Sequence, residues 1–363
     1  MKIGIIRRRF AVASGAELYV QRLLNQLVKT GHEIHLISEY WPCAPDGVVV
    51  HRVEGSVFRG NRIRAFADAV EKQLMVLGLD CTLSLERTRK QTIFRAGDGV
   101  HQAWLDERRK FSSWWRKPFI GVGRFNHQMN LLESAVYNPQ NTGTIIANSN
   151  MVKQDIERYY GFPSDSIRII RNGVDSFRMA SADRDDARKR FGLKHSEFVI
   201  CFVGSGWERK GLPFVLEAVG RIGRGRNVRL VVAGKGRPPM RVPSNVTFLG
   251  PVEDVEMVYG ASDLMMTLPI YEPCANVVTE ALCAGLPVIT TGRNGAAELL
   301  EEGQTGSVVR DANYIQQIVD AIDFWMKLGR GRMKVSNERL SELSIERNSA
   351  ETLNVVTGFK LLK

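Results

Sequence analysis

Short apolar runs alternate with longer amphipathic segments along almost the whole chain, and this alternation limits the fold more than any other feature. Apolar runs of this length are typical of strands buried on both faces of a parallel sheet, and the segments between them supply crossover helices. Such runs occur at residues 2–6, 33–38, 48–53, 81–85, 144–148, 166–170, 198–204, 228–234, 246–250, 263–268 and 287–291. The sequence therefore predicts an α/β protein.

The runs fall into two sets, separated by the turn sequence RNGVD at 171–175. A chain of 363 residues is long enough for two hydrophobic cores. We therefore expect two doubly wound, Rossmann-like domains that face each other across a cleft, at about residues 1–172 and 173–345.

Several function classes are disfavoured by composition. The sequence has no stretch of 18 uncharged apolar residues, and the order of apolar and basic residues at its start does not fit a secretory signal. Its five cysteines are scattered and never form a CxxC pair, which disfavours both a disulfide framework and a zinc site. We expect a cytoplasmic protein that neither is exported nor spans a membrane.

The net charge of +11 is concentrated in the first half of the chain. Residues 1–180 carry 26 Lys and Arg against 17 Asp and Glu, whereas residues 181–363 carry 24 against 22. The first half therefore offers a surface for an anionic partner. Charge alone leaves open whether that partner is nucleic acid, a membrane or a phosphorylated substrate.

Ligands of doubly wound domains bind outside the carboxyl ends of the strands, so functional residues are expected in the loops that follow strands. After the first strand, Ser14-Gly15-Ala16 allow close approach of the backbone to a ligand just before a helix. After residues 198–204, Arg209 and Lys210 precede a helix expected to begin near Leu212. A helix N-terminus with two adjacent cations suits a diphosphate, although such cations are also common as solvated loop residues.

The third loop is the most informative, because YEPCANVVTEALCAGLPVITT (271–291) places two glutamates around a strand-to-helix turn. Glu272 is expected in the loop and Glu280 about one turn into the helix. Ala275 and Asn276 leave room for backbone N–H groups to meet an anion, and Asn276 is expected to cap the helix. Two carboxylates beside an anion site match a ligand of diol, phosphate and diol, as in a nucleotide sugar.

These residues also carry a family resemblance. Glu272 and Glu280 with the following ALCAGLPVITT resemble the E-x7-E motif of retaining nucleotide-sugar glycosyltransferases of the GT-B fold. GSGWERKGLPFVLEA resembles the pyrophosphate loop of that family, SGAELYVQRLL its first glycine-rich loop, and RNGVD its interdomain linker. The resemblance implies that the C-terminal domain binds the nucleotide sugar, that the N-terminal domain holds the acceptor, and that the tail 346–363 returns to the N-terminal domain.

The resemblance also implies roles for individual residues. Glu280 would accept hydrogen bonds from the ribose and Glu272 from the transferred sugar, while Arg209 and Lys210 would hold the pyrophosphate. Backbone groups of Ala275, Asn276 and Val277 would contact the sugar or the distal phosphate, and Gly15 would pack under the diphosphate. The segment GDGVHQAW resembles the family segment whose histidine lies beside the donor sugar, which nominates His101 and, after it, Asp98.

In such enzymes the glutamates bind substrate, and the departing phosphate accepts the proton of the acceptor. No metal is required, because the one D-x-D pattern, Asp183-Arg184-Asp185, is better explained as negative charge at a helix start. No cofactor is expected beyond a UDP-sugar as donor substrate. A nucleotide-sugar epimerase of similar fold remains an alternative, whereas a dinucleotide oxidoreductase lacks its glycine motif and a nucleic-acid-binding module lacks any signature.

Within the family, the chain most resembles lipopolysaccharide core glucosyltransferases, which implies hexose transfer from a UDP-sugar to a core glycolipid or oligosaccharide. A glycosyltransferase for another polysaccharide or glycan is a further alternative. On a helical projection, residues 104–124 place aromatic residues on one side and basic residues on the other, with six Lys and Arg against Asp106 and Glu107. We expect this segment to dock on the anionic inner face of the inner membrane. Packing of its aromatics on the core, or binding of acceptor phosphates by its cations, stays open.

Overall fold

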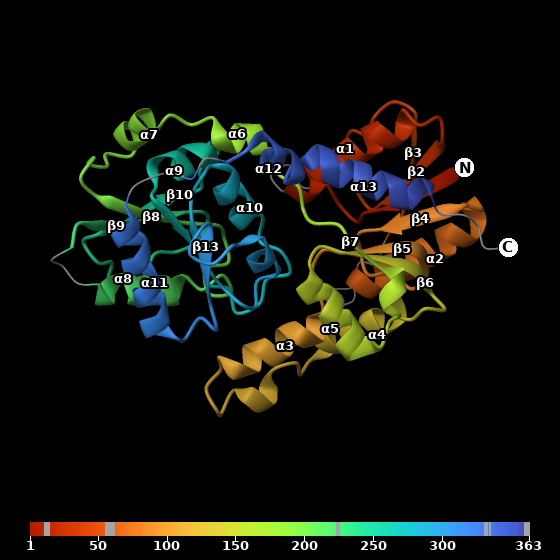
Figure 1. The fold of residues 1–363 in the computed structure, drawn as a ribbon. Helices are drawn as coiled ribbons and strands as arrows, with labels where there is room; N and C mark the ends of the chain where they lie inside the picture. Colours follow the sequence, from red (N-terminus) through yellow and green to blue (C-terminus); the bar gives the residue numbers. More distant parts are fainter. Residues whose placement is uncertain (11–14, 55–61, 223–225, 330–332, 334, 359–363) are drawn as a thin grey trace. The chain divides into compact units, whose positions relative to one another are not determined.

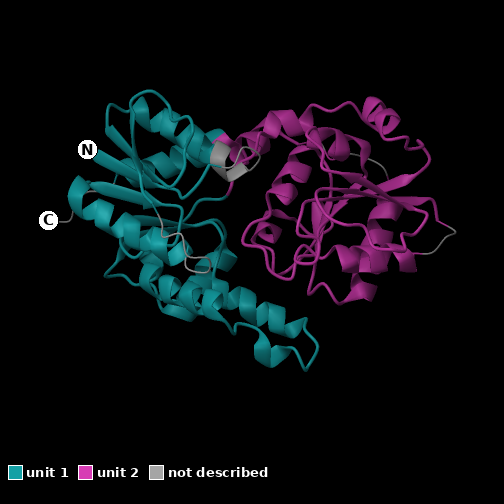
Figure 2. Cartoon of the chain, turned by 180° about the vertical axis from the view of Figure 1, so that it is seen from behind, with its two compact units in different colours: residues 1–171, 346–363 teal, residues 172–345 magenta. Residues whose placement is uncertain are grey.

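The structure is a computed structural model of the 363-residue chain, and it describes every residue except 11–14, 55–61, 223–225, 330–332, 334 and 359–363. The chain divides into two compact units, residues 1–171 with 346–363 and residues 172–345 (Figure 2). Each unit is built on one parallel sheet with helices on its faces (Figure 1). The expected fold class, α/β with two doubly wound, Rossmann-like domains, is confirmed.

The sheet of unit 1 has seven parallel strands in the order β3-β2-β1-β4-β5-β6-β7. Its strands are β1 (Lys2–Ile6), β2 (Glu33–Ser38), β3 (Val48–Arg52), β4 (Cys81–Ser84), β5 (Gln91–Ala96), β6 (Thr142–Ala147) and β7 (Ile167–Ile169). Its helices are α1 (Gly15–Val28), α2 (Arg62–Leu77), α3 (His101–Lys110), α4 (Arg124–Val136), α5 (Asn150–Tyr160) and α13 (Ile345–Thr357), with 3-10 turns η1 (Lys117–Phe119) and η2 (Ser164–Ser166).

Side chains of β1 pack on both faces of the sheet of unit 1, and each face is covered by different helices. Ile3 and Ile5 are buried in one cluster with apolar residues of α1, whereas Ile6 is buried in another with residues of α2. The last helix, α13, runs beside α1 (Figure 1), where Tyr19 donates a hydrogen bond to Thr352 at 3.1 Å. Residues from the two ends of the chain therefore share one core.

The sheet of unit 2 has six parallel strands in the order β10-β9-β8-β11-β12-β13. Its strands are β8 (Phe198–Val203), β9 (Val228–Ala233), β10 (Val246–Gly250), β11 (Leu264–Met266), β12 (Val288–Thr291) and β13 (Gly306–Val309). Its helices are α6 (Ser176–Ala180), α7 (Arg184–Arg190), α8 (Leu212–Arg221), α9 (Val255–Ala261), α10 (Asn276–Cys283), α11 (Ile315–Leu328) and α12 (Asn337–Glu342), with the 3-10 turn η3 (Gly295–Leu299). The neighbours β8 and β11 are far apart in sequence, and their loops form the candidate site.

All eleven expected strands are present, and the sequence pattern missed two others, β5 and β13. In β5 the buried positions include Gln91 and Arg95, which break the apolar run. Arg95 is accommodated because its guanidinium lies 4.5 Å over the ring of Tyr19 on α1. In β13 the strand is only GSVV, and its first residue is a glycine. Neither segment therefore reads as an apolar run in the sequence.

The expectation of one amphipathic helix across residues 104–124 is wrong. The helix α3 ends at Lys110, a turn and η1 follow, and α4 begins only at Arg124. Pro118 within η1 and the left-handed conformations of Gly121 (φ +88°) and Gly123 (φ +119°) interrupt a continuous helix. The helical projection therefore does not describe how these side chains are arranged.

Candidate functional site

The loops after β8 and β11 are joined by backbone hydrogen bonds at the carboxyl end of the sheet in unit 2. The carbonyl of Lys210 accepts from the N–H of Leu268 at 3.2 Å, and that of Arg209 accepts from Ile270 at 3.1 Å. Glu272 follows two residues later. The two predicted cations and the first predicted glutamate are thus brought together by main-chain pairing, which side-chain substitution leaves intact.

Two glycines shape the loop after β8. Gly211 caps α8 in the left-handed conformation (φ +78°), and a Cβ atom there would lie 1.9 Å from the carbonyl oxygen of Leu268. Gly204 (φ +135°) leaves space for Lys210, whose Nζ would lie 2.9 Å from a Cβ at that position. Only glycine fits at either place, and α8 begins at Leu212 as the sequence predicted.

Arg209 and Glu272 form an ion pair, with the arginine Nη1 2.5 Å from Oε2 of the carboxylate. The side chain of Arg209 is 40% exposed and that of Glu272 is 15% exposed. The backbone of Glu272 is fixed on both sides, since its N–H donates to Arg293 and its carbonyl accepts from Gly295. The carboxylate therefore has a fixed base and a partner that water can reach.

The N-terminus of α10 presents backbone donors beside this pair. Ala275 is the N-cap residue, and the N–H groups of Asn276 and Val277 have no hydrogen-bond partner in the described part of the chain. The expected capping by Asn276 is wrong, because Asn276 is already helical and its Oδ1 accepts from Asn172 at 2.9 Å. Two unpaired N–H groups at a helix start form a site for an anion.

Glu280 lies in the second turn of α10, as expected, and its carboxylate contacts Tyr259 of α9. The buried Tyr259 hydroxyl donates to Oε2 of Glu280 at 2.7 Å. Burial raises the pKa of Glu280 above its ordinary value, although this hydrogen bond and the nearby charge of Lys210 oppose the shift. Lys210 and Glu280 are therefore close enough to interact electrostatically.

Two residues of this site were missed by sequence reasoning. Tyr259 sits in a helix that reads as ordinary core packing, and no local pattern points to its contact with Glu280. Asn294 is 1% exposed, and its Oδ1 accepts from the N–H groups of Ala275 and Ala296 at 3.2 and 3.1 Å. The Asn-Gly pair after β12 was a usable signal, because such a pair commonly shapes a loop at a strand end.

In unit 1, His101 is the first residue of α3, at the carboxyl end of β5. Its backbone N–H donates to both carboxylate oxygens of Glu133, at 2.7 and 2.9 Å. Burial lowers the pKa of His101, although the hydrogen bond from its ring to Asn126 and the charge of Glu133 oppose the shift. The lowered pKa favours the neutral imidazole at pH 7.

Glu133 is the centre of a buried cluster that also contains Arg87 and Tyr160. The fully buried carboxylate lies 2.9 Å from the Arg87 guanidinium and accepts from the Tyr160 hydroxyl at 2.8 Å. Burial opposes the charge of Arg87, but Glu133 nevertheless raises the pKa of that guanidinium above its usual value. No sequence signal marked this cluster, because a glutamate inside an amphipathic helix reads as a surface residue.

The other two predicted residues of unit 1 lie at the same edge of its sheet. Asp98 is exposed on the loop between β5 and α3, with Oδ2 3.6 Å from Arg87. Gly15 opens α1, the helix that follows β1, while the preceding Ser14 lies outside the described residues. Each unit thus carries its predicted residues at the carboxyl ends of its strands.

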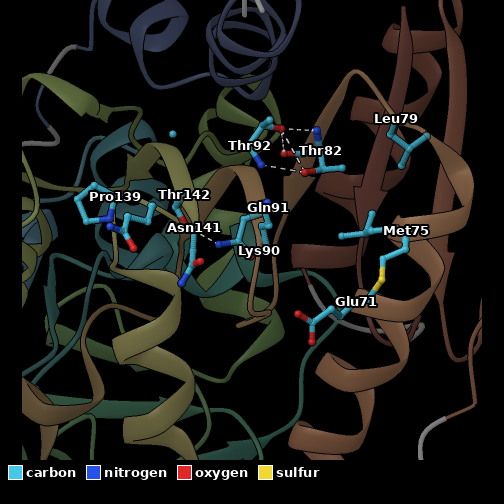
Figure 3. A pocket seen from close by; sticks show the side chains of 13 residues that line it. Glu71, Met75, Leu79, Thr82, Lys90, Gln91, Thr92, Pro139, Asn141 and Thr142 are labelled. Atoms are coloured by element: carbon cyan, nitrogen blue, oxygen red, sulfur yellow. Dashed lines mark hydrogen bonds between the residues drawn. The ribbon is translucent and has the colours of Figure 1, made fainter. Parts of the chain in front are cut away.

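A separate cavity of about 640 Å³ lies at the opposite, amino-terminal edge of the sheet in unit 1 (Figure 3). Residues of α2 line one wall, and the starts of β4, β5 and β6 line the other. The hydroxyl groups of Thr82 and Thr92 there are already hydrogen-bonded, since the Thr92 hydroxyl donates to the carbonyl of Thr82 at 2.8 Å and the Thr92 N–H donates to the Thr82 hydroxyl at 2.9 Å. None of the predicted site residues lines it.

The surface between α3 and α4 carries exposed aromatic side chains. Trp114 is 82% exposed, Trp115 53%, Phe119 72% and Phe125 56%, so core packing does not account for these four. Several cations of the segment are already paired, because Arg109 contacts Asp106 at 2.5 Å and Lys110 contacts Glu107 at 2.8 Å. The other cations of the segment, Arg108, Arg116, Lys117 and Arg124, are exposed, and the last three lie in or next to the stretch that carries the aromatics.

The acidic residues of the pattern at 183–185 lie at the start of helix α7. Asp183 is the N-cap of α7, and its carboxylate accepts from the N–H groups of Asp185 and Asp186 at 2.9 and 3.0 Å. Across the described residues, no three His, Cys, Asp or Glu side chains gather as a metal site would require. Nor does any described helix have the length and apolarity to cross a bilayer.

Comparison with known families and proteins matches both units. Residues 197–327 match the profile of Glycosyl transferases group 1, and residues 99–178 match Glycosyltransferase Family 4. The lipopolysaccharide glucosyltransferase WaaG of Escherichia coli is 26% identical over 327 residues, which cover 85% of each chain. An uncharacterized glycosyltransferase of Methanocaldococcus jannaschii is 24% identical over 341 residues, or 86% of each.

The fold agrees with these matches. A crystal structure of WaaG superposes with a TM-score of 0.77 at 19% identity, covering 98% of this chain and 100% of that one. The chain is a glycosyltransferase of the GT-B type. The Anabaena protein HepE in complex with UDP-glucose has the same fold, with a TM-score of 0.68 at 14% identity over 99% of this chain and 100% of that one.

Proposed function

We propose that this glycosyltransferase moves a hexose, with glucose as the first candidate, from a UDP-sugar to a lipopolysaccharide core or related glycolipid acceptor, with retention of configuration. The observation that carries the donor assignment is the grouping of Arg209, Lys210, Glu272 and Glu280 around the N-terminus of α10. It combines cations and unpaired N–H groups for a diphosphate with two carboxylates for hydroxyl groups. WaaG and the UDP-glucose-bound HepE support the choice of donor and acceptor class.

The geometry gives each donor-site residue a role. Lys210 and Arg209 neutralise the pyrophosphate and stabilise the leaving UDP, together with the N–H groups of Asn276 and Val277. Glu280 accepts from the ribose diol, and Tyr259 holds its carboxylate in place. Glu272 exchanges Arg209 for a hydroxyl of the transferred sugar, because a pair that is 40% exposed on the arginine side opens at little cost.

The proposed reaction proceeds on one face of the sugar. The bond between the anomeric carbon and the UDP oxygen breaks, the acceptor oxygen bonds to that carbon, and the acceptor proton passes to the leaving phosphate. His101 lies beside the donor sugar in this proposal, where its neutral side chain and its carbonyl stabilise positive charge at the anomeric carbon. Asp98 and Gly15 lie at the same sheet edge. The cations and the helix start take the place of a metal.

A nucleotide-release assay tests the proposal. We expect UDP release from UDP-glucose to accelerate at least tenfold when a heptose-terminated core oligosaccharide is added, and NMR of the product to show an α-linked hexose. A panel of UDP-sugars under the same conditions identifies the donor. If the UDP-sugar is converted into its epimer without an acceptor, the protein is an epimerase and the proposed transfer is wrong. A β-linked product would refute retention.

The exposed aromatics Trp114, Trp115 and Phe119 with the cations Arg116, Lys117 and Arg124 form a surface that we propose docks on the cytoplasmic face of the inner membrane. Each cation near an anionic leaflet contributes about 1 kcal/mol, so three give reversible docking that salt weakens. Exposed tryptophans add interfacial affinity. A lipid-linked acceptor is then reached at the membrane surface.

Vesicle sedimentation tests docking. We expect binding to vesicles that contain phosphatidylglycerol at low salt, little binding to phosphatidylcholine vesicles, and loss of binding when Arg116, Lys117 and Arg124 are changed to Ser. A matched control changes three other exposed cations, Lys29, Lys72 and Lys189, which should leave binding unaltered. Equal binding to both vesicle types would exclude the membrane role, and weakened affinity for a phosphorylated core oligosaccharide instead would assign these cations to acceptor phosphates.

A further inference from the structure

The side chain of His101 has a polar partner of its own, in addition to the Glu133 carboxylate that its backbone N–H contacts. Its Nε2 lies 3.0 Å from Oδ1 of Asn126, which is in the first turn of α4. The ring of Phe125 stands edge-on to the imidazole, with centroids 6.0 Å apart at 83°. Residues of α4 therefore hold the imidazole by one hydrogen bond and one aromatic contact. The Glu133 carboxylate, also on α4, accepts from the backbone N–H of the same residue.

The orientation of the Asn126 amide is fixed by a third group. Its Nδ2 lies 3.2 Å from the carbonyl oxygen of Val122. A carbonyl oxygen only accepts, so the NH₂ end of the amide must face Val122 and the oxygen must face the histidine. An amide oxygen also only accepts, so Nε2 of His101 must carry the proton. In the neutral ring, Nδ1 then holds the lone pair.

We propose that Asn126 is the positioning residue of His101, which holds the imidazole in the Nε2–H tautomer and thereby presents Nδ1 as a hydrogen-bond acceptor to a substrate hydroxyl. This inference rests on the proposed role of His101 in transfer. Asn126 acts only through the histidine, and it lies on a helix face that is partly exposed. Its loss therefore alters the ring without disturbing the buried Glu133 cluster.

The tautomer has a consequence for the pH dependence of transfer. Two charged groups act on the imidazole: Glu133 on α4, which favours its protonation, and Arg87 after β4, which opposes it. Asp98 and Tyr160 in turn contact Arg87 and Glu133. Burial lowers the pKa of His101 below its ordinary value of 6.5, so the acceptor form predominates above pH 6.5 and is lost as the pH falls through the lowered pKa. A carboxylate in place of the Asn126 amide favours the imidazolium, and so moves this acid limb to higher pH.

Long-range ¹H–¹⁵N NMR of the full-length protein gives a readout that does not depend on activity. The chain has six histidines, and the His101→Gln variant assigns the signal of interest. We expect the wild-type ring to carry its proton on Nε2, Asn126→Ala to give a mixture of tautomers, and the matched control Gln128→Ala, on the same helix, to leave the signal unchanged. A single Nε2–H tautomer in Asn126→Ala would overturn the inference.

Kinetics with UDP-glucose and the core oligosaccharide complete the test. We expect Asn126→Ala to lower kcat about threefold to tenfold, the size of one hydrogen bond, with the KM for UDP-glucose changed less than twofold. Asn126→Asp should keep the contact and move the acid limb of kcat upward by about one pH unit. An unchanged limb in Asn126→Asp would also overturn the inference.

The two proposals fail in different ways. If His101→Ala transfers sugar at the wild-type rate, then the proposed role of His101 is wrong, whatever Asn126 does. If His101→Ala is slow but Asn126→Ala has wild-type kcat and a wild-type tautomer, then only the positioning role is wrong. Thermal unfolding of Asn126→Ala and Asn126→Asp at the wild-type midpoint separates either result from a folding defect.

Discussion

Each unit holds an arginine–glutamate pair near the carboxyl ends of its strands, and the two pairs differ in their surroundings. In unit 2, Arg209 and Glu272 meet with side chains 40% and 15% exposed. In unit 1, Arg87 and Glu133 meet with side chains 9% and 0% exposed. Water and ligands can reach the first pair, whereas the second is enclosed and also bonded to the His101 N–H and the Tyr160 hydroxyl.

The difference shows that an arginine–glutamate pair can serve two purposes, and that the burial of the pair decides which one it serves. An exposed pair contributes little to stability and can exchange partners when a ligand arrives. A buried pair is costly to break, because removal of one partner leaves an uncompensated charge, and it therefore fixes local geometry. The proposed donor site contains the first kind of pair, and His101 lies beside the second.

The largest expected effect is on stability. Glu133→Ala should lower the free energy of unfolding of unit 1 by about 3–5 kcal/mol, because Arg87 is left buried without a counter-charge. Urea denaturation followed by tryptophan fluorescence suits the measurement, since four of the six tryptophans belong to unit 1. The double variant Arg87→Met with Glu133→Leu should recover part of the loss. A loss below about 1 kcal/mol in Glu133→Ala would show that the two pairs do not differ.

The next effect is on nucleotide affinity. Lys210→Ala should weaken the binding of both UDP and UDP-glucose by about 1.5–3 kcal/mol, or roughly tenfold to a hundredfold, through loss of a charge-assisted contact to phosphate. Calorimetry measures it, with the exposed lysine variant Lys189→Ala as the control. Wild-type affinity for UDP in Lys210→Ala would refute the phosphate role.

A smaller effect on UDP affinity is expected when the hydrogen bond from Tyr259 to Glu280 is removed. Tyr259→Phe removes a hydrogen bond that lowers the pKa of Glu280, so that pKa should rise further. In the proposed role the carboxylate form of Glu280 accepts from the ribose diol, so affinity should fall as the pH drops through this pKa. UDP titrations between pH 5 and 8 should show a loss of about twofold to fivefold that begins at higher pH in Tyr259→Phe. Parallel pH profiles for the two proteins would contradict this coupling.

The smallest effect on stability is expected from Glu272→Ala, below about 1 kcal/mol, since the pair is partly exposed. Affinity for UDP should stay the same or rise, because Arg209 is released toward the pyrophosphate. The preference for one UDP-sugar over another should decline, because Glu272 is assigned to the sugar. Competition titrations with several UDP-sugars measure this preference. Equal losses for bare UDP and for UDP-glucose would reverse the assignments of Glu272 and Glu280.

The donor loops were largely predictable because their signals are local. A strand, a short loop with cations or glutamates, and a helix follow one another within about twenty residues, and parallel strands place such loops at one sheet edge. The contacts inside the site were less predictable. Nothing near Tyr259 in the sequence indicates Glu280, and Asn276 reads as a helix cap although it pairs with Asn172.

The sequence by itself determined the α/β class, eleven strands and the grouping of Arg209, Lys210, Glu272 and Glu280, because apolar periodicity and local loop chemistry are properties of contiguous residues. Only the tertiary structure decided that residues 104–124 are not one helix, that Glu133 is buried, and that Asn126 meets His101. Those outcomes depend on which segments pack together, and the energy of a buried charge or of one hydrogen bond is set by neighbours that lie far away along the chain.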